Sequence, residues 1–365
     1  MLTFIKKEPV LCISGILAFL SCFFVTPDKT YLSYINWRTL ILLFSLMSVV
    51  SGASHAGTFH YISGKLTSGI ASVRKLSLVF TLLCFFLSMF ITNDVALVTV
   101  VPLTLLTMSH VSSRDLIFAL VQETIAANLG SMLMPFGNPQ NLFLSSFYGI
   151  GMKDFVLLML PYTVLSLLLL LLQTFLVHNV PITSGNNTTE LHPLDTRSLM
   201  LYILLFLISL LSIAHILDEK ILLLIILVAI GGYNRRIFRD VNYSLLLTFL
   251  FFFVLIGNLG RMETIRNLLI QMLSGREQLT SVISSQFISN VPAAILLSGF
   301  TDQGRALIIG TNLGGLGTLI ASMASLITYQ LYAADQKAQP GYYLLIFTLL
   351  NVADLAILML ASFMI

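Results

Sequence analysis

The chain has 365 residues, of which 57% are hydrophobic and only 10% charged. A soluble domain carries about 25% charged residues, so the composition excludes a soluble globular protein and a disordered chain. The formal net charge of +3 is too small to indicate a polyanionic partner, which excludes a nucleic-acid binder. Several apolar runs reach the roughly 20 residues that cross a bilayer, and they do not alternate as barrel strands do. We therefore predict an all-α polytopic membrane protein in a lipid bilayer.

The N-terminal segment is predicted to be the first membrane helix. Its apolar run, residues 9–26, follows Lys6 and Lys7. No clear small-x-small cleavage site comes after it, and further spans follow, so a signal peptide is the poorer interpretation. The two lysines place the N-terminus in the cytoplasm.

Two pairs of short apolar segments predict re-entrant helical hairpins. Residues 76–91 and 95–109 flank a polar tip near 92–94, and residues 278–289 and 291–300 flank a second tip near 289–291. Each segment is too short to span about 30 Å of hydrocarbon at 1.5 Å per residue. A tip with free backbone groups is tolerated at membrane depth only inside protein or beside a water-filled cavity.

A helix with a Gly- and Asn-rich interruption follows each hairpin. The first reads AANLGSMLMPFGNPQN over residues 126–141, and the second reads GTNLGGLGTLIAS over residues 310–322. Proline and glycine do not continue a helix comfortably. We expect helix breaks at 137–141 and at 312–318.

The two halves of the chain read as repeats. ANLGS (127–131) superposes on TNLGG (311–315), and TNDVAL (92–97) superposes on SNVPAA (289–294). The predicted division is a first repeat over residues 1–177, a linker loop and connecting helix over 178–218, and a second repeat over 219–365.

The distribution of basic residues predicts that the second repeat is inverted. With the N-terminus inside, two spans return the chain to Lys65, Arg74 and Lys75 on the same side. The helix after the linker crosses outward, so the second repeat begins on the opposite side and its hairpin opens outside. This topology has nine spans and an outward C-terminus.

Inverted repeats with discontinuous helices are typical of secondary transporters, whose site lies near the midplane at the repeat interface. Helix N-termini at the breaks favour an anion, and unwound carbonyls and hydroxyls hold a cation. The predicted substrate- and ion-binding residues lie at the tips and breaks: Thr92, Asn93, Asp94, Asn128, Ser131, Gly137, Asn138, Asn141, Ser289, Asn290, Asn312, Gly314, Gly315 and Thr318. Glu123 and Ser322 form a second tier.

Asp94 is the acidic residue of the first tip. A carboxylate within the membrane is costly and indicates a function, here proton carriage or Na⁺ binding. The second tip has Val291 at the matching position, so a two-carboxylate site is not expected. Glu123 is expected either to face the same cavity or to pair with a basic residue.

Other chemistries lack their motifs in this sequence. Cys12, Cys22 and Cys84 lie in apolar runs and form no CxxC pair, and the histidines form no close ligand pair. We therefore assign no metal and no cofactor beyond a coupling ion, Na⁺ or H⁺. The chain has no GxxxxGK[ST], HExxH or GxSxG motif, so neither ATP driving nor an enzyme is predicted.

The tips TNDVALVTVVPLT and SNVPAAILL, the GNPQN break and the run NLGGLGTLIASMASLI resemble the ion transporter superfamily. That group includes arsenite permeases, citrate and dicarboxylate symporters and NhaD-like antiporters. The resemblance implies an inverted-repeat fold with a scaffold and a moving transport domain, often a homodimer, working by an elevator motion. In the dicarboxylate branch Ser-Asn-Thr tips bind sodium and a carboxylate. Here the third tip residues are Asp94 and Val291, and the first tip is more similar to the arsenite-permease and antiporter side.

Our hypothesis from the sequence is a secondary active transporter of a small anion or oxyacid, of the arsenite or carboxylate type, in the inner or plasma membrane. It would be coupled to H⁺ or Na⁺ and work by alternating access. One alternative is a Na⁺/H⁺ antiporter with no anion substrate. Another is an ion channel or a membrane scaffold subunit.

Overall fold

The computed structural model describes residues 8–67, 70, 72–181 and 195–364. Lys6 and Lys7, which carry the predicted orientation, and residues 182–194 of the predicted linker lie outside this part. Helices make up the named elements of the described residues, with one isolated bridge between Ser72 and Pro181. The predicted all-α fold class is confirmed.

The first half of the chain forms these elements: α2 (Pro9–Ser21), α3 (Tyr31–Tyr34), α4 (Trp37–His55), α5 (Thr58–Thr67), α6 (Val73–Phe90), α7 (Asn93–Thr107), α8 (Ser113–Ser131), α9 (Pro139–Tyr148), α10 (Met152–Gln173) and η1 (Thr174–Leu176). The second half forms α11 (Thr196–Ile213), α12 (Glu219–Asn234), η2 (Arg235–Asp240), α13 (Tyr243–Arg261), α14 (Glu263–Leu273), α15 (Glu277–Ile288), α16 (Asn290–Ser298), α17 (Gly304–Leu313), α18 (Met323–Ala333) and α19 (Pro340–Ser362).

Seven helices of the described residues are long and apolar enough to cross a membrane: α4, α6, α10, α11, α12, α13 and α19. The first arm of the first hairpin, α6, has 18 residues, so the prediction that this arm is too short to span is wrong. Large apolar side chains on them face outward, for example Leu172, Leu224 and Leu349, each more than half exposed. Such a surface suits lipid. Of the nine predicted spans, 9–26 contains only the 13-residue α2, while 115–150 and 303–333 each consist of two shorter helices.

The same order of elements occurs in both halves of the chain. A long helix and a short helix (α4 and α5, then α13 and α14) precede a tight helical pair (α6 and α7, then α15 and α16). An interrupted helix follows (α8 and α9, then α17 and α18), and a long helix ends the series (α10, then α19). The domain boundaries themselves stay a prediction.

The halves exchange partners at their interrupted helices. The first arm of each hairpin packs on the helix before the break of its own half, α6 on α8 and α15 on α17. The helix after each break packs on the other half, with α9 against α16 and α18 against α7. The hairpins and breaks of both halves therefore meet in one body.

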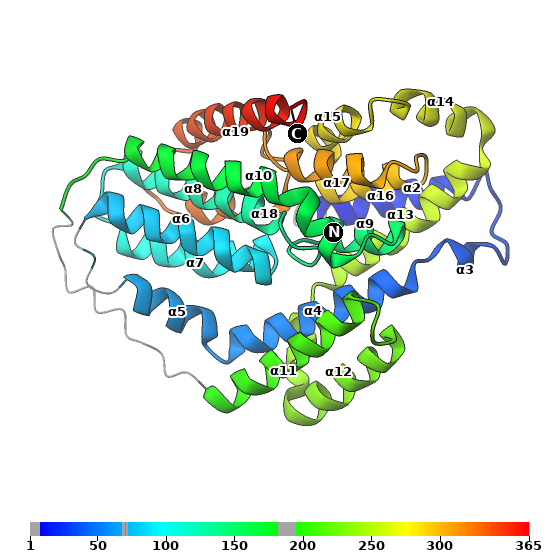
Figure 1. The fold of residues 1–365 in the computed structure, drawn as a ribbon, viewed down its shortest axis with the longest axis horizontal. Coiled ribbons are helices and arrows are strands. Elements are labelled where there is room, and N and C mark those ends of the chain that lie inside the picture. Colours follow the sequence, from blue (N-terminus) through cyan, green and yellow to red (C-terminus); the bar gives the residue numbers. More distant parts are fainter. Residues whose placement is uncertain (1–7, 68–69, 71, 182–194, 365) are drawn as a thin grey trace.

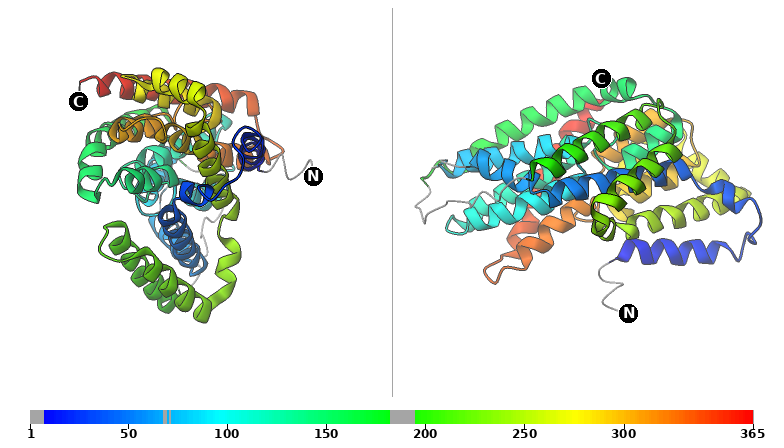
Figure 2. Two further views of the ribbon diagram at one scale, coloured as in Figure 1. Left: turned by 90° about the vertical axis from the view of Figure 1, so that its right-hand side faces the viewer. Right: turned by 90° about the horizontal axis from the view of Figure 1, so that it is seen from below.

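A second group of helices lies beside this body. Figure 1 shows α4, α11 and α12 together below the hairpins and interrupted helices, with α13 running between the two groups. In the left view of Figure 2, α11 and α12 form the edge of the molecule farthest from α19. The N-terminal α2 packs along α13.

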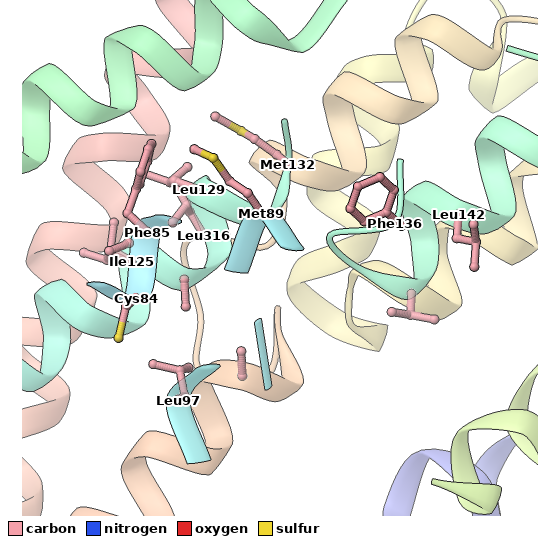
Figure 3. Close-up of a cluster of buried hydrophobic side chains, with 14 of the residues drawn as sticks. Cys84, Phe85, Met89, Leu97, Ile125, Leu129, Met132, Phe136, Leu142 and Leu316 are labelled. Carbon is pink, nitrogen blue, oxygen red and sulfur yellow. The ribbon is translucent and has the colours of Figure 1, made fainter. Parts of the chain in front are cut away.

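The core of the hairpin body consists of apolar side chains from α6, α7, α8 and the segments around the breaks. Figure 3 shows this cluster, with Phe85 and Leu129 among its fully buried members. Glycines let the layers approach closely: a Cβ on Gly130 would lie 2.0 Å from the carbonyl oxygen of Phe85, and one on Gly314 would lie 2.7 Å from Ser285 Oγ. Gly130 and Gly314 match in the repeat, so both halves use the same close packing.

Candidate functional site

The N-termini of four helices meet at one small cavity of about 60 Å³. The first-turn residues that line it come from α7, α9, α16 and α18, and those of α2 and α13 complete the wall. We call this the central cavity. Its lining includes Asn93, Asp94, Pro139, Gln140, Ser289, Asn290, Val291, Pro292, Ser322 and Met323, with Glu8, Asn242, Ser244 and Thr248 from α2 and α13 or just before them. Both predicted tips therefore converge on one space.

The two tips differ in backbone conformation. Ile91 and Thr92 separate α6 from α7, and both are extended. Ser289 alone separates α15 from α16, and it takes a φ of 73° with a ψ of 154°. A positive φ is unfavourable for a residue with a Cβ, and such strain gathers at functional sites. The second tip is the tighter of the two.

Asn128 links the first tip to the second break. Its Oδ1 accepts hydrogen bonds from Asn93 Nδ2 and from Ser322 Oγ, both at 2.9 Å, and its Nδ2 donates to Ser325 Oγ at 3.4 Å. Ser322 is the N-cap residue of α18. The amide therefore ties the hairpin of one half to the interrupted helix of the other.

Asn312 makes the equivalent links in the opposite direction. Its Oδ1 accepts from Asn138 Nδ2 at 3.1 Å, and its Nδ2 donates to Asn141 Oδ1 at 2.6 Å. Asn138 is the N-cap residue of α9. The alignment that superposes Asn128 on Asn312 also superposes Asn138 on Ser322 and Asn141 on Ser325, so the links to the opposite break correspond. The bond from Asn93 to Asn128 has no counterpart at Asn312 among the hydrogen bonds of the described residues.

Side-chain amides satisfy the unwound backbone at both breaks. Asn141 Nδ2 lies 3.3–3.5 Å from the carbonyls of Ser131, Met132 and Met134. At the second break, Gln286 Nε2 donates to the carbonyls of Gly314 and Leu316, and its Oε1 accepts from the N–H of Thr318. These amides replace the intrahelical partners that a break removes.

A larger cavity of about 480 Å³ adjoins the central one and shares Glu8, Asp94, Pro139 and Asn242 with it. We call it the lateral cavity. On one side it is lined by α4, with Leu46 and Val50 among the lining residues. On the other side it is lined by α7, α9 and α18 of the hairpin body. The cavity therefore lies between part of α4 and the hairpin body, while α4 also packs directly on α9.

The cavity walls carry acidic groups. Glu8 and Asp94 line both cavities, and Asp240 lines the lateral one, where it pairs with His55 at 2.7 Å. Within the described ranges, no lysine or arginine lines either cavity, and Asp94 forms no salt bridge. Positive potential in the walls therefore comes from the helix N-termini.

The predicted site residues fall into three groups. Those that line a cavity are Thr92, Asn93, Asp94, Asn138, Ser289, Asn290 and Ser322. A second group is buried behind this lining: Asn128, Ser131, Gly137, Asn141, Asn312, Gly314 and Gly315. Thr318 is exposed and bonds Gln286, while Glu123 is fully buried against Thr104. Glu123 lines neither cavity and has no basic partner among the described residues, contrary to both expectations for it.

The breaks begin in different places than the sequence predicts. The first runs over residues 132–138 and the second over 314–322. Pro139 opens α9 because a proline at the first helical position loses no hydrogen bond. Asn141 and Asn312 therefore lie within helices, where their side chains still reach the breaks.

Sequence reasoning missed Glu8, Gln140, Asn242 and Gln286. Asn242 caps α13, and a helix start after a polar residue is a readable signal. Gln286 lies within an apolar hairpin arm, three residues before the tip, and an uncharged amide there gives no periodic signal. Its role follows from the packing of α15 on α17.

Comparisons with known proteins agree with this architecture. The family model described as citrate transporter matches residues 1–302. An uncharacterized transporter of Methanocaldococcus jannaschii is 35% identical over 326 residues, covering 89% of this chain and 88% of the relative. Inner membrane protein YbiR of Escherichia coli is 32% identical over 324 residues, covering 87% and 86%. A protein of Dictyostelium discoideum named as the transporter arsB is 30% identical over 135 residues, covering 36% of this chain and 23% of that protein.

The family match covers most of the chain and includes both tips and the first break. The resemblance to the ion transporter superfamily is therefore confirmed, and the chain is a multi-pass membrane protein that belongs to the citrate transporter family.

Proposed function

We propose that this chain is a secondary active transporter of a small anion or oxyacid, of the arsenite or carboxylate type, coupled to H⁺ or Na⁺. The observation that carries the proposal is the convergence of the N-termini of α7, α9, α16 and α18 on the central cavity. Each N-terminus is equivalent to about +0.5 elementary charge. Four of them around one space favour a negatively charged or strongly polar solute.

Asp94 is the residue proposed to bind the coupling ion. It lies in the first turn of α7 and lines both cavities without a basic partner in the described part of the chain. A carboxylate at this depth is costly unless a proton or a cation accompanies it. An anion and a cation bound together would offset each other's charge in the cavity.

A Na⁺/H⁺ antiporter without an anion substrate is the second candidate. Glu8, Asp94 and Asp240 give the walls acidic character, which suits a cation. Since no lysine or arginine of the described residues lines the cavities, the side chains alone favour a cation while the helix N-termini favour an anion. A direct assay separates the two candidates.

The transport cycle is proposed to be alternating access by an elevator motion. The lateral cavity lies between the α4 group and the hairpin body, which supports a movement of one group against the other. We further propose a location in the cell membrane, a cytoplasmic N-terminus and a homodimer.

Thermal unfolding of the purified protein tests the proposal, using arsenite, citrate, succinate, sulfate and Na⁺ as separate additions. A ligand that binds the folded form raises the melting temperature. We expect one of the anions to do so, and that anion to enter proteoliposomes only with an H⁺ or Na⁺ gradient. Sodium-driven pH changes with no anion present would instead establish the antiporter. Fast flux without a counter-ion stoichiometry would establish a channel.

A further inference from the structure

Glu123 is a buried carboxyl that the proposed substrate site does not use. It lies in the middle of α8 with no exposed surface. Its Oε1 accepts a hydrogen bond from Thr104 Oγ1 at 2.7 Å, and its Oε2 has no partner among the described residues. No salt bridge neutralises it there.

Among the described residues, no cationic side chain lies beside Glu123. Thr104 faces it from α7, the Cys84 thiol from α6 and the Tyr343 phenol from α19. Among the described residues of α10, α17 and α18, which also pack on α8, none contributes a charge that acts on this carboxyl. An isolated carboxylate in such a place is too costly to persist, so the resting state holds a proton.

The neutral acid is not fully satisfied either. A buried polar atom without a partner costs about 1–3 kcal/mol. Glutamine would keep the Thr104 hydrogen bond without any charge, so hydrogen bonding alone does not require an acid here. A glutamic acid at this position, in place of a glutamine, is explained if its carboxyl loses and regains a proton.

Glu123 lies where a change of charge would reach the substrate site. It precedes Asn128 by five residues on α8, about 7.5 Å along the helix axis. The pairs Thr104–Glu123 and Asn93–Asn128 both join α7 to α8. Loss of the proton would place an unpaired charge on the same helix contact that positions the first tip.

We propose that Glu123 is a proton-binding residue of the transport cycle, distinct from Asp94. This inference rests on the proposed function. It identifies H⁺ as a coupling ion and places its binding at Glu123, away from Asp94. Glu123 has no exposed surface in this structure, so the proposed cycle includes a change of conformation that lets water reach it. The carboxylate takes one proton when it is open to one side of the membrane and releases it when open to the other, with no change in any other bond. Thr104 holds the carboxyl in place in both states.

Infrared difference spectroscopy of the purified protein between acidic and alkaline buffer tests this directly and needs no substrate. We expect wild type to show the C=O band of a titrating carboxylic acid, and Glu123→Gln to lose one such band. Asp354→Asn is the matched control: Asp354 is a second fully buried acid, bonded by Gln173, on α19. The Glu123 band should persist in it.

Proton flux coupled to the anion in proteoliposomes gives the functional measurement. With the anion identified by the thermal screen, we expect Glu123→Gln to reduce proton flux at least ten-fold while that anion still raises its melting temperature. Thr104→Val keeps the acid but removes its hydrogen-bond donor, so it should shift the pH at which the Glu123 band is half titrated. This variant supplies the test if Glu123→Gln does not fold. An unchanged carboxyl spectrum in Glu123→Gln, or an unmoved midpoint in Thr104→Val where the first variant fails, would overturn the inference. Failure of the thermal screen would count against the proposed function but not against a titrating Glu123.

Discussion

Asn128 and Asn312 occupy matching positions before the two breaks, and each reaches across to the N-cap residue of the other half. Asn128 bonds Ser322, the cap of α18, and Asn312 bonds Asn138, the cap of α9. This reciprocity ties both breaks and the first tip into one buried network. Neither amide lines a cavity, so their role is to hold the residues that do.

Replacing either asparagine should therefore impair transport and stability together. Asn312→Ala removes three hydrogen bonds, two to side chains and one to the carbonyl of Ile308. At about 1 kcal/mol each, a loss of about 3 kcal/mol in unfolding free energy is expected. Asn128→Ala should act alike, whereas Asn267→Ala on the exposed α14 should change little. Thermal unfolding and uptake measure both effects, and wild-type uptake in Asn128→Ala would contradict this role.

Gln286 should be required for the shape of the second break. Gln286→Leu leaves the carbonyls of Gly314 and Leu316 and the N–H of Thr318 without their partners. We expect the free energy of unfolding to fall by about 2–3 kcal/mol, which lowers the melting temperature. Gln303→Leu, at an exposed position, is the control. Equal melting temperatures for the two variants would show that the break does not need this amide.

Ser289 offers a test of strain at the second tip. Ser289→Gly removes the conformational cost of its positive φ, about 1–3 kcal/mol, and also removes the hydroxyl. Ser289→Ala removes the hydroxyl and keeps the strain. We expect the glycine variant to unfold at a higher temperature than the alanine variant, with transport lowered in both if the hydroxyl contacts the solute. The reverse order of melting temperatures would argue against a strained tip.

Two helical glycines in different surroundings should respond in opposite ways to replacement by alanine. Gly130→Ala would place a Cβ 2.0 Å from a backbone oxygen of α6, and overpacking of this kind costs about 1–3 kcal/mol. Gly232→Ala on the exposed face of α12 meets no atom within 4 Å and should gain helix stability of about 1 kcal/mol. Thermal unfolding of the two variants should therefore shift in opposite directions, and a gain in both would contradict the packing.

Sequence reasoning reached the helical fold, both tips and the matching of the breaks because these depend on local chemistry. The polar interruptions of the apolar sequence at Asn93 and Asn290 and the glycines near Asn312 are visible without coordinates. The identity of the lining residues depends on long-range packing. Glu8 reaches the cavity only because α2 lies along α13, and Gln286 reaches the second break only because α15 packs on α17.

Glu123 is a residue that the sequence suggests for the cavity but that long-range packing keeps out of it. Its position before Asn128 suggests a shared cavity, but it lies farther along the contact between α7 and α8, where it bonds Thr104 and lines neither cavity. That burial, and the absence of a cation in the surrounding described residues, follow only from which helices pack there.

The most direct test of the transport site is uptake of the anion identified by the thermal screen into proteoliposomes by wild type, Asn93→Ala and Asn290→Ala. Both asparagines line the central cavity, one from each tip. We expect wild type to accumulate the anion under an H⁺ or Na⁺ gradient, and each variant to remain folded with an uptake rate at least ten-fold lower. Wild-type rates in both variants would show that the solute does not pass between the tips.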